Sequence, residues 1–197
     1  MTALFGYISF ILSILKTIPY ARDIFLKKTK PERASWLIWT LLVWIAFFSQ
    51  LAKGATDSLW LTAGVGITAL LIFSLSLKFG VGGFTRRDVT ALGIAGLGLV
   101  FWYITNEPIY ALAIAIAIDA IGTLLTAIKS YEHPFEETLI AWITAIAIGI
   151  FGVLAVGSFE PFLLAYPVYI TVANVTIVTC LIIGRHRQRK QSIYTSN

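Results

Sequence analysis

The sequence is poor in charged residues and nearly free of cysteine. Only 13% of its 197 residues are charged, whereas 58% are hydrophobic; in soluble domains about a quarter of the residues are charged. This composition excludes a soluble domain. The single cysteine, Cys180, excludes a disulfide within the chain. The sequence also lacks the Gly-rich phosphate loop and the dinucleotide fingerprint, so we expect no bound nucleotide to supply energy.

Residues that build catalytic metal sites are scarce as well. The two histidines, His133 and His186, lie outside the apolar runs, whereas an intramembrane metal hydrolase needs several histidines and acids around one ion. A retinal protein needs a lysine in its last span, and none occurs between Pro161 and Ile183. We therefore expect no enzyme activity, no metal and no cofactor.

Long apolar runs are what the sequence has instead. Each is close to the roughly 20 residues that a helix needs to cross a bilayer, and none alternates with polar residues as a barrel strand would. Pro108 and Pro161 lie where first helical turns are expected, a position that tolerates proline. The fold predicted is an all-α membrane protein with seven transmembrane helices, at about 3–25, 35–52, 58–78, 89–105, 109–129, 138–156 and 161–183.

Basic residues are distributed unevenly between the two sides of these spans. One side holds 13 of the 15 Lys and Arg residues, the other holds only Lys53, and Lys16 lies within the first span. Because basic loops stay in the cytoplasm, the N-terminus is predicted outside and the C-terminus inside, in a plasma or bacterial inner membrane. We expect the basic segment 185–190 to bind anionic lipid and not nucleic acid. A homo-oligomer is compatible with this composition.

The chain also matches itself at an offset of 103 residues. Ten of 38 aligned positions are identical, about three times the roughly 8% expected by chance for this composition. The pairs are Pro31/Pro134, Trp39/Trp142, Phe48/Phe151, Leu51/Leu154, Ala52/Ala155, Gly54/Gly157, Leu61/Leu164, Val65/Val168, Ile67/Ile170 and Thr68/Thr171. We call two residues 103 positions apart repeat mates.

The repeat predicts how the chain is divided. Residues 1–80 form a first three-helix repeat, 81–106 a linker helix, 107–184 a second three-helix repeat and 185–197 a basic cytoplasmic tail. Since one linker helix separates the repeats, both have the same orientation and are related by an axis along the membrane normal.

This 3+1+3 arrangement resembles the SWEET sugar transporters and the PQ-loop superfamily, which includes the PnuC-type vitamin transporters. The segment Ile18-Pro19-Tyr20, the basic run 27–30 and the segment Ala34-Ser35-Trp36 look like a PQ-loop in which Tyr20 replaces the glutamine. The second repeat has Gly122-Thr123 instead. The resemblance implies alternating-access transport and places Asn174 at a substrate-binding asparagine, although its repeat mate is Leu71.

Two charged residues within the spans are repeat mates. Lys16 lies in the first span and Asp119 in the fifth, and burying either costs at least ~2.5–3.5 kcal/mol. We predict that they face one central cavity, as a direct or water-bridged pair or as a purely structural one. Both belong to stripes of small and polar residues at helical spacing, which form either a cavity lining or a helix contact.

The remaining candidates are aromatic residues and helix-bending residues. Trp39 and Trp142 offer flat faces for a sugar or a heterocycle. Pro19 and Gly122 are predicted hinges, and Pro167 lies between two tyrosines at a predicted outer gate. The predicted substrate-binding residues are Lys16, Tyr20, Trp39, Asp119, Thr123, Trp142 and Asn174, and the predicted gating residues are Pro19, Gly122 and Pro167.

The function predicted is transport of a small polar, sugar-like metabolite by alternating access, either by facilitated diffusion or by proton coupling through Asp119. Two alternatives stay open. One is PnuC-type transport of a vitamin or nucleoside, and the other is a membrane sensor or assembly subunit that transports nothing.

Overall fold

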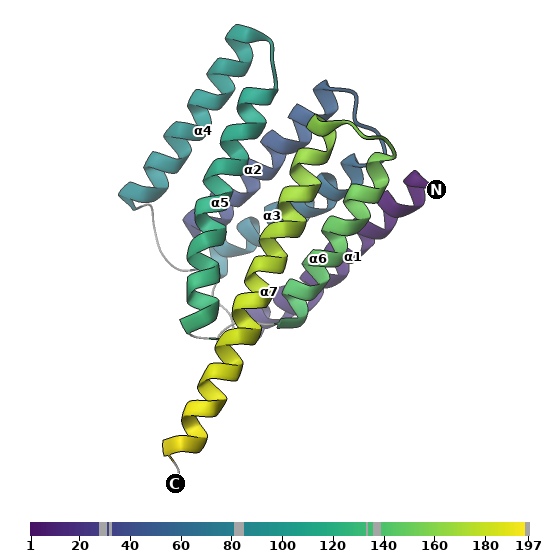
Figure 1. Cartoon of the computed structure of the whole chain (residues 1–197). Coiled ribbons are helices and arrows are strands. Elements are labelled where there is room, and N and C mark those ends of the chain that lie inside the picture. Colours follow the sequence, from purple (N-terminus) through teal and green to yellow (C-terminus); the bar gives the residue numbers. More distant parts are fainter. Residues whose placement is uncertain (28–30, 32, 81–84, 133, 136–138, 196–197) are drawn as a thin grey trace.

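The computed structural model describes residues 1–27, 31, 33–80, 85–132, 134–135 and 139–195. These residues form helices joined by short turns, without strands among them (Figure 1). The helices are α1 (Thr2–Phe25), α2 (Arg33–Ala52), α3 (Leu59–Phe79), α4 (Arg86–Thr105), α5 (Ile109–Glu132), α6 (Leu139–Val156) and α7 (Pro161–Thr195). The all-helical prediction is confirmed. Lys28, Lys30 and His133, which entered the sequence argument, lie outside the described residues.

Among the described residues, six helices are long and apolar enough to cross a membrane. A helix is also present where the sequence predicts one at 89–105, within α4, and its described apolar stretch is Leu92–Thr105.

Prolines and glycines fix where several helices begin and end. Pro161 is the first residue of α7, and Pro108 directly precedes α5 and accepts a hydrogen bond from the backbone N–H of Leu112; both match the first-turn preference of proline. Gly54 and Gly157 follow the ends of α2 and α6 with φ of +82° and +69°. Two repeat mates thus have the same left-handed conformation, which glycine adopts without steric strain.

The helices pack in a pattern that recurs along the chain. α3 packs against both α1 and α2, and α7 packs against both α5 and α6. Across the middle, α1 packs on α6 and α2 on α5. A buried core that includes Val43, Leu61, Leu112, Ile148 and Tyr166 joins five of the helices. α4 lies at one edge of the bundle, mainly against α5 (Figure 1).

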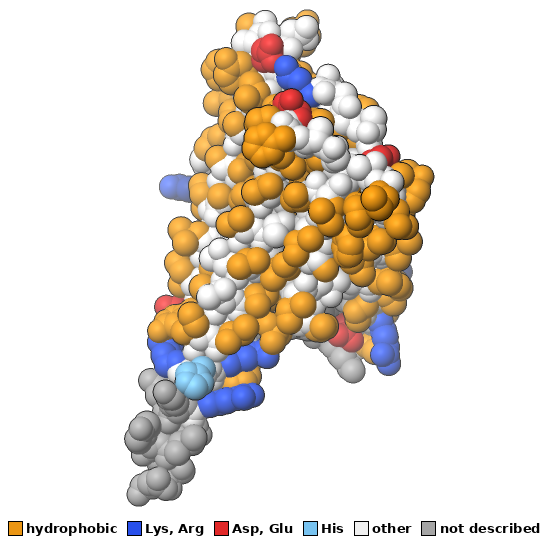
Figure 2. All heavy atoms as spheres, turned by 45° about the vertical axis from the view of Figure 1, so that its right-hand side comes forward, with side chains coloured by type: hydrophobic (Ala, Val, Ile, Leu, Met, Phe, Trp, Pro, Cys, Tyr) orange, Lys and Arg blue, Asp and Glu red, His pale blue; other side chains and the backbone are white. Residues whose placement is uncertain are grey.

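The outer surface of the bundle is apolar and its interior is partly polar. On α1, Leu4, Ile11 and Leu15 are more than half exposed, whereas Ser9 and Ser13 are buried. Orange apolar side chains cover the middle of the molecule in Figure 2, and blue Lys and Arg side chains gather mainly toward one end. This inverted distribution is the one expected of helices in lipid.

The segment predicted as a basic cytoplasmic tail, 185–197, is helical in its described part. α7 continues to Thr195 as one helix and projects beyond the others (Figure 1), because Arg, Gln and Lys are good helix formers. Two side chains fasten it to the end of α5 and to the turn beyond: Gln188 Nε2 donates to the carbonyl of Glu132, the last residue of α5, at 2.7 Å, and Arg185 Nε donates to the Pro134 carbonyl at 3.1 Å.

Candidate functional site

Asp119 lies at one end of a chain of hydrogen bonds between α5 and α7. Tyr169 Oη on α7 donates to Asp119 Oδ2 at 2.6 Å, and Tyr169 Oη and Thr123 Oγ1 are 3.2 Å apart. Since the phenol proton is directed at the carboxylate, Thr123 donates to the phenol oxygen. Asp119 and Thr123 are four residues apart and therefore share one face of α5. The arrangement presents a carboxylate and two hydroxyls together in an apolar bundle.

Trp39 borders this group from α2. A Cβ atom added at Gly122 would lie 3.9 Å from Trp39 Nε1, and Gly122 is three residues from Asp119 on the same face of α5. Aromatic rings continue from there toward α1: Trp36 packs edge-on against Trp39 at 5.3 Å, and Tyr20 lies 5.6 Å from Trp36 between ring centroids. The assignment of Trp39 as a flat wall of a substrate site stays a prediction.

Lys16 has a different environment, at the contact between α1 and α6. Its Nζ lies 5.9 Å from the centre of the Trp142 ring, within the range of a cation–π interaction. The same contact includes a hydrogen bond from Ser9 Oγ to the Ile148 carbonyl at 2.9 Å. Lys16 is half-buried and lies opposite the exposed stripe of α1, because a 100° step per residue turns it away from Ile11, Leu15 and their neighbours.

The two charged repeat mates therefore occupy corresponding helix contacts. Lys16 on α1 lies beside Trp142 on α6, and the Asp119 face of α5 lies beside Trp39 on α2. Trp39 and Trp142 are themselves repeat mates. In each case a charged helix of one half of the chain meets a tryptophan of the other half.

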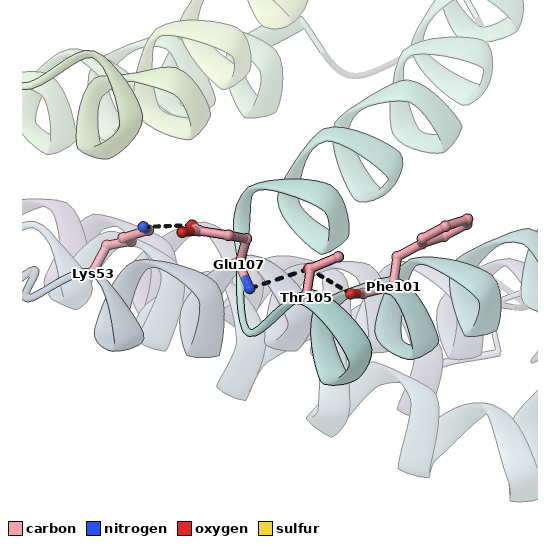
Figure 3. Close-up of polar contacts among 4 residues, drawn as sticks. All are labelled: Lys53, Phe101, Thr105 and Glu107. Carbon is pink, nitrogen blue, oxygen red and sulfur yellow. Dashed lines mark hydrogen bonds and ion pairs between the residues drawn. The ribbon is translucent and has the colours of Figure 1, made fainter.

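The direct ion pair between Lys16 and Asp119 that the sequence suggested is not formed. Among the side chains that the structure describes, the ion pair found is Lys53–Glu107, with Nζ and Oε2 2.7 Å apart (Figure 3). Thr105 supports it, since its Oγ1 accepts from the Glu107 N–H at 3.3 Å and donates to the Phe101 carbonyl at 2.6 Å. This pair links the end of α2 to the turn between α4 and α5.

Three predicted residues take no part in these two groups. Asn174 is buried and its Nδ2 donates to the Ile170 carbonyl of its own helix at 2.7 Å. Pro19 is exposed within α1, and Pro167 is buried within α7. Both prolines remove a hydrogen-bond donor from a helix interior, so their assignment as hinges stays a prediction.

Sequence reasoning did not assign Tyr169 to the substrate site, although the structure makes it the direct partner of Asp119. The distance of each residue from the start of its helix would have identified this partner. Asp119 is 10 residues from the start of α5 and Tyr169 is 8 residues from the start of α7, which places both about 12–15 Å along helices that run in the same direction. The phenol of Tyr169 therefore lies at the depth of the Asp119 carboxylate.

Comparison of the chain with protein-family models, with curated proteins and with solved structures gave no match. Among the described residues, no three or more His, Cys, Asp or Glu side chains group closely enough to hold a metal ion.

Proposed function

We propose that this protein is a seven-helix transporter in which α1–α3 and α5–α7 form two parallel three-helix units joined by α4. The helix packing supports the division, since α3 and α7 have equivalent places in the two halves and the cross-contacts α1–α6 and α2–α5 correspond. The matched left-handed glycines Gly54 and Gly157 support it as well.

The observation that carries the proposal is the inward placement of charge in both units. Lys16 and Asp119 are repeat mates on faces turned away from the exposed stripes of their helices. Intramembrane ionisable residues are expensive and mark substrate or ion pathways by default. Two of them on equivalent faces point to one pathway between the units.

The substrate class follows from the groups on these faces. Trp39 and Trp142 supply flat apolar surfaces for stacking on a ring or a hydroxylated chain. Asp119, Tyr169 and Thr123 form a linked set of acceptors and donors that suits a hydroxylated compound. A small polar, sugar-like metabolite matches both features. Rocking of one unit against the other across the α1–α6 and α2–α5 contacts would expose the pathway alternately to the two sides.

The proposed orientation has the N-terminus outside. Lys53 and Lys78 are exposed at opposite ends of neighbouring helices, so a Cys180→Ala background with Lys53→Cys or Lys78→Cys tests it. A membrane-impermeant maleimide should label Lys53→Cys on intact cells and Lys78→Cys only after permeabilisation. Labelling of both positions from outside would refute the topology.

Transport itself is tested with purified protein. Thermal stabilisation is measured across sugars, nucleosides and vitamins, because a ligand that binds the folded state raises its stability; uptake of each stabilising compound into reconstituted vesicles follows. We expect stabilisation and saturable uptake of at least one small polar compound. A nucleoside or vitamin as the only substrate would favour the PnuC-like alternative, and no response to any compound would favour a sensor or assembly subunit.

Proton coupling is separable from binding in the same vesicles. If Asp119 carries the proton, Asp119→Asn abolishes accumulation driven by a pH gradient and leaves exchange of labelled substrate intact. Equal accumulation by the variant and the wild type would assign facilitated diffusion.

A further inference from the structure

Lys16 is a cation in the apolar part of the bundle for which the structure describes no anionic partner. α1 packs mainly against α3 and α6, and neither of these helices contains Asp or Glu. Asp119 accepts a hydrogen bond from Tyr169 instead, and no described carboxylate lies within ion-pair distance of Lys16. A buried charge that lacks a counter-charge is strongly disfavoured.

The Lys16 ammonium is also reachable. Among the described residues, the fully enclosed side-chain nitrogen and oxygen atoms without a hydrogen-bond partner are Ser49 Oγ, Ser130 Oγ and Arg187 Nε. Lys16 Nζ is not one of them and makes no hydrogen bond in the described part of the chain, so it keeps some accessible surface beside the Trp142 ring. The Trp142 ring contacts the Lys16 ammonium through its aromatic face. This contact does not use the N–H donors of the ammonium, whereas a carboxylate would accept hydrogen bonds from them.

We propose that Lys16 is an anion-binding subsite that takes the carboxylate of the transported compound. The proposal rests on the transport function above and narrows its substrate class from a neutral sugar-like molecule to a small hydroxylated carboxylate. A carboxylate at Lys16 forms charge-assisted hydrogen bonds and supplies the missing counter-charge.

Matched pairs of compounds isolate the contribution of the carboxylate to binding. The probes are lactate and propane-1,2-diol, glycerate and glycerol, and gluconate and sorbitol, in which each acid has a neutral alcohol of the same chain length. Thermal stabilisation of the full-length protein is measured with sodium chloride added to equal ionic strength. We expect at least one acid to stabilise the protein saturably and its alcohol to do so at least about tenfold more weakly.

Variants at Lys16 test the residue. Lys16→Gln should weaken binding of that acid about tenfold or more and so remove the preference for the acid over its alcohol, whereas Lys16→Arg keeps the charge and most of the binding. Lys78→Gln removes a lysine exposed at the end of α3 and serves as the matched control. A Lys16→Gln protein that melts at the wild-type temperature without ligand shows that the loss is not one of folding.

The outcomes separate this subsite from the proposed function. Stabilisation and uptake of a neutral compound, with no preference for acids and no effect of Lys16→Gln, would overturn the anion subsite and leave the transporter. An acid that binds Lys16→Gln as well as the wild type would also overturn it. Failure of every compound in this set and in the broader library would overturn both.

Discussion

The two halves of the chain share a packing plan and differ in the chemistry placed on it. Asp119 in the second half has a hydroxyl partner, Tyr169, whose repeat mate is Gly66. In the first half the space at Gly66 is bordered by the Trp44 ring, 3.1 Å from where a Cβ would be, and the repeat mate of Trp44 is Ala147. The large residue of this pair of positions thus lies on α2 in the first half and on α7 in the second half.

The different positions of the large residue show how two halves that pack alike can differ in chemistry. Packing is kept because each half contains one large and one small residue at the two positions, and volume-conserving changes cost little. The chemistry changes because the large residue of the second half is a tyrosine, whose hydroxyl reaches Asp119. Lys16 has no equivalent hydroxyl from α3, since the corresponding position is Gly66. One half therefore has an acid hydrogen-bonded to a tyrosine and the other a lysine beside a tryptophan ring.

The largest expected effect comes from breaking the acidic half. Asp119→Asn should lower uptake driven by a pH gradient in reconstituted vesicles by about tenfold or more, because it removes the carboxylate that would carry the proton. Tyr169→Phe should lower the same uptake severalfold, because it removes the hydrogen bond to that carboxylate. Initial rates of uptake measure both. Tyr103→Phe, at a side chain 90% exposed, is the control and should match the wild type. Wild-type rates for Tyr169→Phe would show that the hydrogen bond is structural only.

A double-mutant cycle compares the two halves directly. If Lys16 and Asp119 formed the direct pair that the sequence suggested, Lys16→Met together with Asp119→Asn would recover part of the stability lost in each single variant. With Trp142 beside one residue and Tyr169 beside the other, we expect the free energies of unfolding to add within about 0.5 kcal/mol. Unfolding in mixed SDS micelles provides these values. A coupling energy well above 1 kcal/mol would restore the paired interpretation.

The two outer turns offer a smaller, matched comparison. Gly54→Ala should destabilise the protein by about 1 kcal/mol, because alanine is strained at positive φ. Gly157→Ala should cost about 2 kcal/mol or more, since its new Cβ would also collide with Thr2. Thermal melts of the two variants measure the difference. A larger loss for Gly54→Ala would contradict the close contact at Thr2.

The smallest effect is expected at the outer ion pair, which has no counterpart in the second half because the repeat mate of Lys53 is Val156. Lys53 and Glu107 side chains are 39% and 52% exposed, so Lys53→Gln should change stability by less than about 1 kcal/mol. Melting curves at low and high salt check this, and any loss should disappear at high salt. A loss that persists there would mean that the pair holds α2 to α5 by packing.

The sequence predicted the helices well because their signals are local. Apolar runs between charges placed each helix start within about three residues, and Pro161 marked the start of α7. Gly54 and Gly157 were found as repeat mates, and their shared conformation follows from one turn chemistry. The packing of α3 between α1 and α2 was not predictable in this way, since it depends on contacts between distant segments.

For the candidate residues, the sequence indicated which residues to consider but not which neighbours each would contact. Lys16, Asp119, Trp39 and Trp142 were chosen from charge and repeat position, and the structure places them at corresponding helix contacts. Which partner each would take depends on side-chain volume in neighbouring helices, as the Gly66 and Tyr169 exchange illustrates. An internal repeat in the sequence shows which positions correspond, but not which side chains fill the space between neighbouring helices.

The extension of α7 has a mechanical consequence. From Gly184 to Thr195 the helix continues for about 17 Å at 1.5 Å per residue, and Arg185 and Gln188 fasten its base to the end of α5 and to the turn beyond. A helix anchored at its base that projects beyond the other helices (Figure 1) can act as a lever arm. If the second unit tilts by about 10°, the tip moves by roughly 3 Å over that length. A fluorophore at the tip of α7 would therefore amplify rocking motions that are too small to follow at Asp119 itself.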